Sequence, residues 1–221
     1  MWDSEVMGPL LQGAQVTVQV TVMAAALGTV MSIASGLLGM APFRLIRWTN
    51  QVYVDFFRGS SAIIQLYWAF FALPLIGPSL TPMEAGVIVL GLNMGSYGSE
   101  IVRGALRAVP QGQIEAAIAL NLNTYDRIRY VTFPQAVVAM LPPYGNLLIE
   151  LLKATALVSL IALSDIVWEA QVLRRQPGTA GSDVIFGSVL LIYFAIALVI
   201  TGLVRMAERY ASRGMSAGGR L

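Results

Sequence analysis

No charged residue occurs between Glu5 and Arg44, and this uncharged run restricts the fold more than any other feature of the chain. A helix needs about 20 consecutive apolar residues to cross a bilayer, so the run is long enough for a complete span. Asp3 and Glu5 precede it, where a secretory signal peptide has basic residues. This pattern favours a retained first span near residues 14–40 over a cleaved leader, and it predicts an integral membrane protein.

The composition agrees with a membrane location and excludes several function classes. Charged residues make up 12% of the chain, whereas soluble domains have about 25%. The chain has no cysteine and no histidine, which removes disulfides, thiolate metal sites and the usual general base. Its one lysine, Lys153, does not belong to a glycine-rich phosphate-binding loop. We therefore expect no catalytic residue, no metal site, no cofactor and no nucleic-acid partner.

Four further uncharged or weakly charged stretches predict additional spans. They lie near residues 53–75, from Glu84 onward, near 135–163 and at 184–204, which gives an all-α protein with five transmembrane helices. We expect one transmembrane domain over residues 1–210 and a flexible C-terminal tail over 211–221. The segment from Trp168 to Asp183 is predicted to be an outer loop with a turn at Pro177-Gly178.

The arginines predict the orientation of these spans. Inner segments of bacterial membrane proteins are richer in arginine and lysine than outer segments. With the N-terminus outside, the outer segments hold only Arg174 and Arg175. The inner segments then hold Arg44, Arg47, Arg103, Arg107, Arg127, Arg129, Arg205, Arg209, Arg213 and Arg220. This arrangement places the C-terminus and the loop at about 106–134 in the cytoplasm.

The cytoplasmic loop contains helix-forming residues of its own. Gln113 to Leu122 is predicted to be helical, and Asp126 is expected to cap a second helix that stops at Pro134. Glu115 would lie in the first turn of the first helix, where the helix dipole favours a carboxylate. Its role is therefore either structural or that of a contact for a cytoplasmic partner.

The same loop resembles the EAA loop of bacterial ABC importer permeases. The similarity rests on Glu115-Ala116-Ala117, Ala119-Leu120 and the segment Val131–Ala136. Flanking segments are similar to the polar amino acid branch of that family, the type that transports histidine, glutamate, glutamine or arginine. These segments are Phe57-Arg58-Gly59, Ser99–Ala105, Gly112-Gln113, Leu151–Leu157 and Ser159.

The resemblance implies a MetI-like permease subunit of a type I importer, in the bacterial inner membrane. It implies a second permease subunit, identical or homologous, two ATP-binding subunits that hold ATP and magnesium, and an extracytoplasmic solute-binding protein. Contacts with the ATPase would come from Gly112, Glu115, Ala116, Ala117, Leu120 and Asn121. The transported solute would be a polar amino acid or a related small zwitterion, with compatible solutes such as ectoine as a second possibility.

Two positions depart from the family pattern. Asn121 stands where the family has glycine, and asparagine can also adopt the left-handed conformation that such a turn needs. Ser60-Ser61 replaces the family's Thr-Pro, which removes a rigid element from the start of a helix.

Ionisable residues in the third and fourth predicted spans mark the expected substrate pathway. Glu100 and Arg103 share a helical face with Ser96 and Arg107, and Glu150 and Lys153 share one with Asn146. Each Glu precedes a cation by three residues, which is compatible with an internal ion pair. Alternatively, Glu150 accepts the ammonium group of a zwitterion, Lys153 donates to its carboxylate, and Asn146 does either.

Pro142-Pro143 allows two interpretations, a broken helix at a binding site or the beginning of the fourth span. The sequence as a whole predicts an importer permease that works by alternating access and is driven by a separate ATPase. A secondary transporter or channel that needs no ATPase, and a membrane-anchored assembly subunit, are the alternatives.

Overall fold

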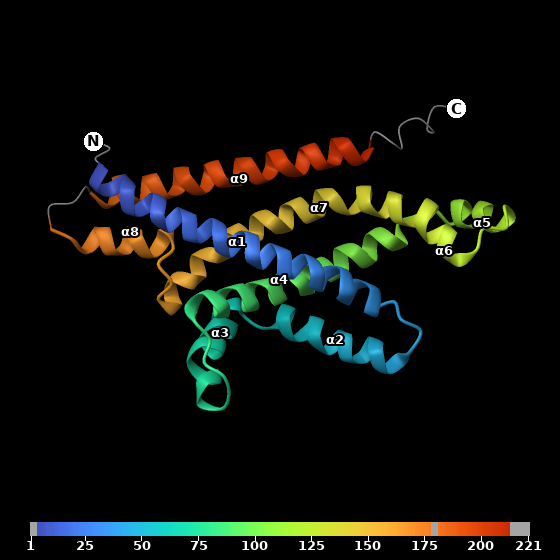
Figure 1. Ribbon diagram of the computed structural model, residues 1–221, viewed down its shortest axis with the longest axis horizontal. Helices are drawn as coiled ribbons and strands as arrows, with labels where there is room; N and C mark the ends of the chain where they lie inside the picture. The colour runs from blue at the N-terminus through green and yellow to red at the C-terminus, as the bar shows by residue number, and fades with distance from the viewer. Residues whose placement is uncertain (1–3, 178–180, 213–221) are drawn as a thin grey trace.

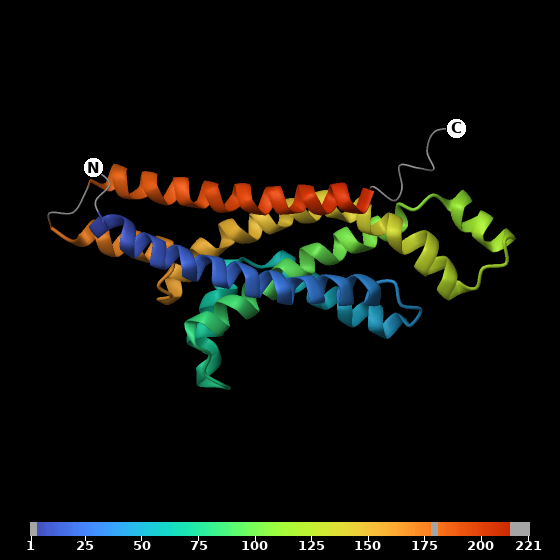
Figure 2. The same cartoon turned by 45° about the horizontal axis from the view of Figure 1, so that its top comes forward.

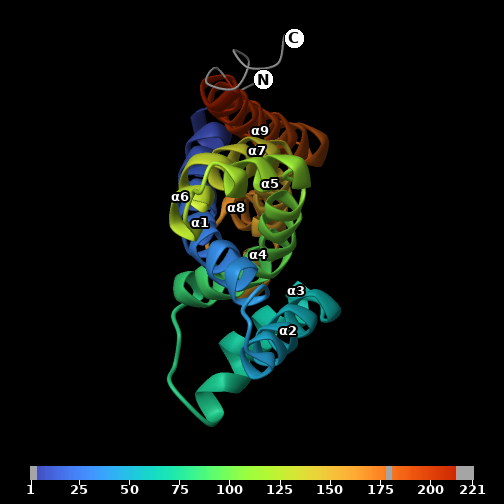
Figure 3. The same ribbon diagram turned by 90° about the vertical axis from the view of Figure 1, so that its right-hand side faces the viewer.

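The protein is an elongated helical bundle in the computed structural model, which describes residues 4–177 and 181–212. Its long helices are α1 (Ser4–Leu38), α4 (Pro82–Arg107), α7 (Phe133–Ala154) and α9 (Ser182–Ser212). They run along the same axis in Figure 1, and the end view in Figure 3 shows α2 (Arg44–Gly59) and α3 (Ala62–Tyr67) on the side away from α9. The expected all-α fold is confirmed.

Three stretches in the described residues are long and apolar enough to cross a membrane by length and composition. They are Val6–Leu38, Thr124–Ile161 and Ser182–Ser212. α4 has 26 residues, which is also long enough, but its composition does not place it among these three. The count of five spans and the orientation of the termini therefore stay predictions.

The two ends of the bundle differ. The start of α1 lies beside α8 (Ile166–Arg175) at one end, whereas α5 (Gln111–Ala119) and α6 (Thr124–Arg127) extend beyond the other end (Figures 1 and 2). α9 connects the two ends, so its last residues point in the same direction as α5 and α6.

α1 and α4 approach each other closely because small residues line their contact. A Cβ atom added at Gly98 of α4 would collide with the side chain of Ser32 on α1, and one added at Gly95 would lie 2.5 Å from Met31 Cβ. Ser32 is fully buried, and its hydroxyl donates to Gly28 O at 2.6 Å within its own helix. Small residues of this kind let two helix backbones pack tightly inside a membrane.

The predicted second span is not one helix. α2 ends at Gly59, and Ser60 and Ser61 both have extended backbone angles before α3 begins. α3 then continues as a π-helical segment η1 (Trp68–Ala72) and a 3-10 segment η2 (Leu73–Leu75). The polar Gly-Ser-Ser sequence breaks the helix, and polar side chains from outside α2 bond the carbonyl groups that the break leaves free.

The predicted stop at Pro134 is wrong, and so is the predicted helix break at Pro142-Pro143. α6, the π-helical segment η3 (Ile128–Thr132) and α7 follow one another without a break. Pro134 lies in the first turn of α7, where its missing N–H is not needed. Pro142 and Pro143 lie inside α7, which neither begins nor breaks there and tightens only later, into the 3-10 segment η4 (Thr155–Ile161).

Several predicted boundaries need correction. α1 begins at Ser4 and α9 continues to Ser212, because apolar and helix-forming residues extend beyond the windows at 14–40 and 184–204. The predicted outer loop contains α8 as far as Arg175. Gly178 of the predicted turn and residues 213–221 of the predicted tail lie outside the described residues, whereas Ala211 and Ser212 belong to α9.

Asp165 fixes the start of α8. Its side chain is fully buried, and its Oδ1 accepts a hydrogen bond from the Trp168 backbone N–H at 2.9 Å. Its other oxygen, Oδ2, is buried without a hydrogen-bond partner. Gly13 of α1 packs directly on this linker, since a Cβ atom added there would lie 2.7 Å from Ile166 Cα. The carboxyl is therefore held in a tight, buried junction.

Candidate functional site

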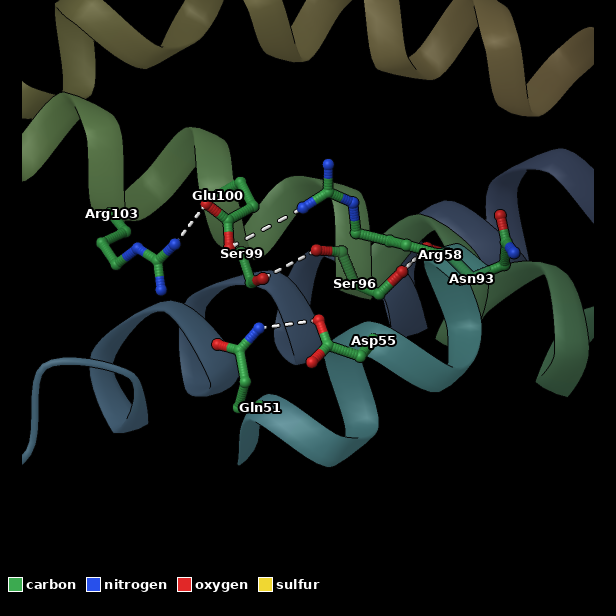
Figure 4. A network of polar contacts seen from close by, with 8 residues as sticks. All are labelled: Gln51, Asp55, Arg58, Asn93, Ser96, Ser99, Glu100 and Arg103. Atoms are coloured by element: carbon green, nitrogen blue, oxygen red, sulfur yellow. Dashed lines mark hydrogen bonds and ion pairs between the residues drawn. The ribbon is translucent and has the colours of Figure 1, made fainter. Parts of the chain in front are cut away.

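Glu100 of α4 joins two arginines from different helices. Its Oε2 accepts from Arg103 Nη2 on the same helix, and its Oε1 lies 3.9 Å from Arg58 Nη1 at the end of α2 (Figure 4). The internal Glu100–Arg103 pair expected from the sequence is present. Arg58 is an additional partner that spacing along one helix could not reveal, although it belongs to the Phe57-Arg58-Gly59 motif.

The other polar residues on this face of α4 bond within their own helix. The Ser96 hydroxyl donates to Asn93 O and the Ser99 hydroxyl to Ser96 O, each at 2.7 Å (Figure 4). Ser96 is fully buried, whereas Arg107 is exposed at the end of α4. These serines therefore support the helix and do not present groups to a solute.

A cavity of about 210 Å³ lies between α4 and α7. Glu150 of α7 places a carboxylate in the wall of this cavity, and Asn93 and Tyr97 of α4 contribute further polar groups. The Arg58 guanidinium lies over the Tyr97 ring, 5.3 Å from its centroid. The remaining lining residues are Leu90, Met94, Leu147, Leu151 and Ala154. The cavity thus combines an apolar wall, one carboxylate and an arginine at its border.

The predicted pathway residues are only partly brought together. Glu150 lines the cavity, but Asn146, Lys153, Glu100 and Arg103 do not. Among the described residues, Glu150 and Lys153 form no ion pair, so the internal pair considered for α7 is absent. Asn93 and Tyr97 were missed, although Asn93 precedes Ser96 by three residues on the same helical face.

The break between α2 and α3 lies against this cavity wall. Gln65 of α3 is 7% exposed, and its Nε2 lies 3.1 Å from Phe57 O and 2.8 Å from Ser60 Oγ. Asn93 Nδ2 donates to the same Phe57 carbonyl at 3.0 Å. Discontinuous helices often mark the binding sites of transporters, because their free backbone groups need polar partners.

The predicted coupling loop forms a short helix that projects from the bundle (Figures 1 and 2). α5 begins at Gln111, two residues earlier than predicted, so Glu115 does not lie in its first turn. The structural explanation based on the helix dipole is therefore wrong for Glu115. Of the predicted contact residues, Gly112, Glu115, Ala116, Leu120 and Asn121 are exposed and Ala117 is buried.

The turn after α5 has the conformation that the sequence suggested. Asn121 has φ 57°, a left-handed conformation, and its N–H donates to Ile118 O at 2.8 Å. Asn123, not Asp126, caps α6, since its side chain accepts from the Asp126 N–H at 2.9 Å. Both asparagines are suited to these positions by their short polar side chains.

Comparison with known proteins identifies the family. Residues 14–213 match the family described as "Binding-protein-dependent transport system inner membrane component". The chain belongs to this family. It is therefore a permease component of a bacterial inner-membrane ABC transport system, and the ATPase of such systems is a separate subunit. The channel and the assembly subunit considered from the sequence do not fit this membership.

Individual relatives agree with the family membership. The probable amino-acid ABC transporter permease protein y4tF of Sinorhizobium fredii is 42% identical over 94% of this chain and 89% of its own length. The arginine transport system permease protein ArtQ of Bacillus subtilis is 32% identical over 90% and 91%.

Solved structures share the fold. A crystal structure of an amino acid ABC transporter with histidines matches with a TM-score of 0.85 and 29% identity, over 93% of this chain and 95% of that chain. An inward-facing structure of the MetNI methionine ABC transporter has a TM-score of 0.76 at 21% identity, over 95% and 99%, which supports the fold alone.

Proposed function

We propose that the chain imports a polar amino acid and that the cavity between α4 and α7 forms part of its pathway. The observation that carries this proposal is the position of Glu150, a carboxylate that lines the cavity together with the polar residues Asn93 and Tyr97. A carboxylate at membrane depth is costly unless it faces a partner or water, so a positively charged solute group is a suitable partner. Relatives named for arginine, glutamine and cystine transport support an amino acid as the solute.

The two charged groups of an amino acid have candidate partners at this cavity. Glu150 accepts the ammonium group. Arg58 donates to the carboxylate, since its guanidinium lies 5.3 Å from the centroid of the Tyr97 ring, which lines the cavity. Neither Arg58 nor Lys153 lines the cavity itself, and among the described residues Lys153 has no such contact with a lining residue. Arg58 also contacts Glu100, so solute binding competes with this ion pair and alters how the end of α2 is held.

Transport needs partners that this chain does not supply. In the proposed arrangement a second permease completes the pathway, two ATP-binding subunits hold ATP and magnesium, and a solute-binding protein delivers the solute from outside. α5 docks on one ATP-binding subunit through Glu115, Ala116 and Leu120, which are all exposed. Closure of the ATPase pair moves α5 and, through α6 and η3, the continuous helix α7 that carries Glu150.

Replacement of Glu150 tests the pathway. Hydrogen bonds to charged groups contribute about 1.5–3 kcal/mol, so Glu150→Ala is expected to lower ATP-dependent uptake roughly ten- to a hundredfold. The basal ATPase activity of the complex should not change. Glu208→Ala, on α9 and away from this cavity, is the matched control. Uptake by Glu150→Ala equal to that of the wild type would show that the solute passes elsewhere.

Replacement of Glu115 tests the coupling surface separately. Glu115→Lys reverses an exposed charge on α5 and is expected to remove the ATP-binding subunit from the purified complex. Gln111→Lys introduces the same charge at another exposed position of α5 and should retain that subunit. If both variants retain it equally, α5 is not the docking helix.

A further inference from the structure

The break between α2 and α3 leaves carbonyl groups that need hydrogen-bond donors. Phe57 and Ser60 have no helical partner for their carbonyl oxygens, because the backbone becomes extended at Ser60 and Ser61. An unsatisfied backbone group costs several kcal/mol where water is excluded. The geometry of the break therefore depends on whatever side chains supply the missing donors.

Gln65 supplies most of them. Its Nε2 lies within hydrogen-bond distance of Phe57 O at 3.1 Å, Ser60 O at 3.2 Å and Ser60 Oγ at 2.8 Å. The Ser60 hydroxyl itself donates to Phe56 O at 2.6 Å, so its oxygen is free to accept from Gln65. One buried amide thus holds both sides of the break together.

Asn93 completes the network from α4. Its Nδ2 donates to Phe57 O at 3.0 Å and lies 3.4 Å from Gln65 Oε1. A side-chain amide has two N–H donors and one carbonyl oxygen. Both donors of Asn93 point to the helix break, which leaves Oδ1 as the group available to the cavity that Asn93 shares with Glu150.

We propose that Gln65 is a positioning residue for solute recognition, which fixes the helix break and orients the Asn93 amide so that its oxygen faces the cavity as a hydrogen-bond acceptor. Asn93 and Glu150 together then form a wall of acceptors. Such a wall selects a solute group rich in N–H donors, such as an ammonium, guanidinium or amide group. The inference rests on the proposed function and deepens it, since Gln65 itself does not line the cavity.

A double-mutant cycle in cells tests this role. The variants are Gln65→Met, Asn93→Ala and their combination, supplied to a strain that lacks the wild-type chain but keeps the partner subunits. The probes are radiolabelled L-arginine, L-glutamine and L-glutamate, and the rate is measured for the one that the wild type imports best, at equal abundance in the membrane. Gln51→Met is the matched control, because Gln51 is exposed and its side chain bonds to Asp55 on its own helix.

Gln65→Met and Asn93→Ala are each expected to lower the uptake rate about tenfold, and the double variant should be no slower than Asn93→Ala. Gln51→Met should import at the wild-type rate. A wild-type rate for Gln65→Met overturns the inference, and so does a combined loss near a hundredfold, since Gln65 would then act independently of Asn93.

A milder variant covers the case in which Gln65→Met does not reach the membrane. Ser60→Ala removes the shortest hydrogen bond of Gln65 and is expected to slow uptake about threefold. An unchanged rate for Ser60→Ala overturns the inference. Loss of ATP dependence in the wild type would instead contradict the proposed function, so the two failures are distinguishable.

Discussion

Replacement of Asp165 by asparagine is expected to stabilise the protein at neutral pH and to change little at acidic pH. Asp165 is fully buried at the start of α8, and only one of its two carboxyl oxygens has a hydrogen-bond partner. Burial, with a smaller contribution from the neighbouring Glu169, raises the pKa of the Asp165 carboxyl from 3.8 to about 6. Backbone N–H groups of Trp168 and Val167 oppose this rise without cancelling it.

The direction of the effect follows from the raised pKa. The folded state binds a proton at Asp165 more tightly than the unfolded state, so folding is favoured at low pH. Stability is lost as the pH rises from about 4 to about 6. A rise of about two pKa units corresponds to roughly 3 kcal/mol at pH 7. Asparagine is neutral at every pH, and its oxygen can still accept from the Trp168 N–H.

The assay is thermal unfolding of the purified complex between pH 4.5 and 7.5, followed by tryptophan fluorescence. For a chain of this size roughly 3 kcal/mol corresponds to about 6–12 °C, so Asp165→Asn should melt higher by up to that amount at pH 7.5. The difference should disappear towards pH 4.5. Asp183→Asn, an exposed aspartate in the first turn of α9, is the control and should follow the wild type. Parallel curves for Asp165→Asn and the wild type would refute the argument.

Two further predictions concern glycine and asparagine positions. Gly98→Ala should lower the stability by about 1–3 kcal/mol, because its Cβ would collide with Ser32. Gly104→Ala, on the same helix with open space around it, should be neutral or stabilising by up to about 1 kcal/mol, as thermal unfolding would show. Asn121→Gly should leave the retention of the ATP-binding subunit unchanged. Asn121→Val should weaken it, because a β-branched residue at φ 57° is strained by roughly 1–2 kcal/mol or more; equal retention by the two variants would contradict the role of this turn.

The long helices and the turn after α5 could be predicted from local sequence. The uncharged run before Arg44 specifies α1, and the left-handed conformation of Asn121 follows from the chemistry of that one residue. The family resemblance drew attention to the segment around Glu115, and in the structure this segment is α5, a short helix that projects from the bundle.

The helix break and the cavity could not be predicted, because they depend on contacts between distant segments. Asn93 bonds to Phe57, 36 residues earlier, and Arg58 meets Glu100 only when α2 lies along α4. Lys153 was assigned to the pathway from its spacing relative to Glu150. Helical spacing shows which residues share a face, but not which face meets a cavity.

The close contact between α1 and α4 has a mechanical consequence. Ser32 sits where Gly98 has no side chain, so one helix cannot slide along the other without first lifting away from it. α1 and α4 should consequently move together as one rigid body. A displacement that begins near Arg103, at one end of α4, would then move Asn93 by the same amount. The distance between α7 and this pair of helices would be the one that changes in each transport cycle.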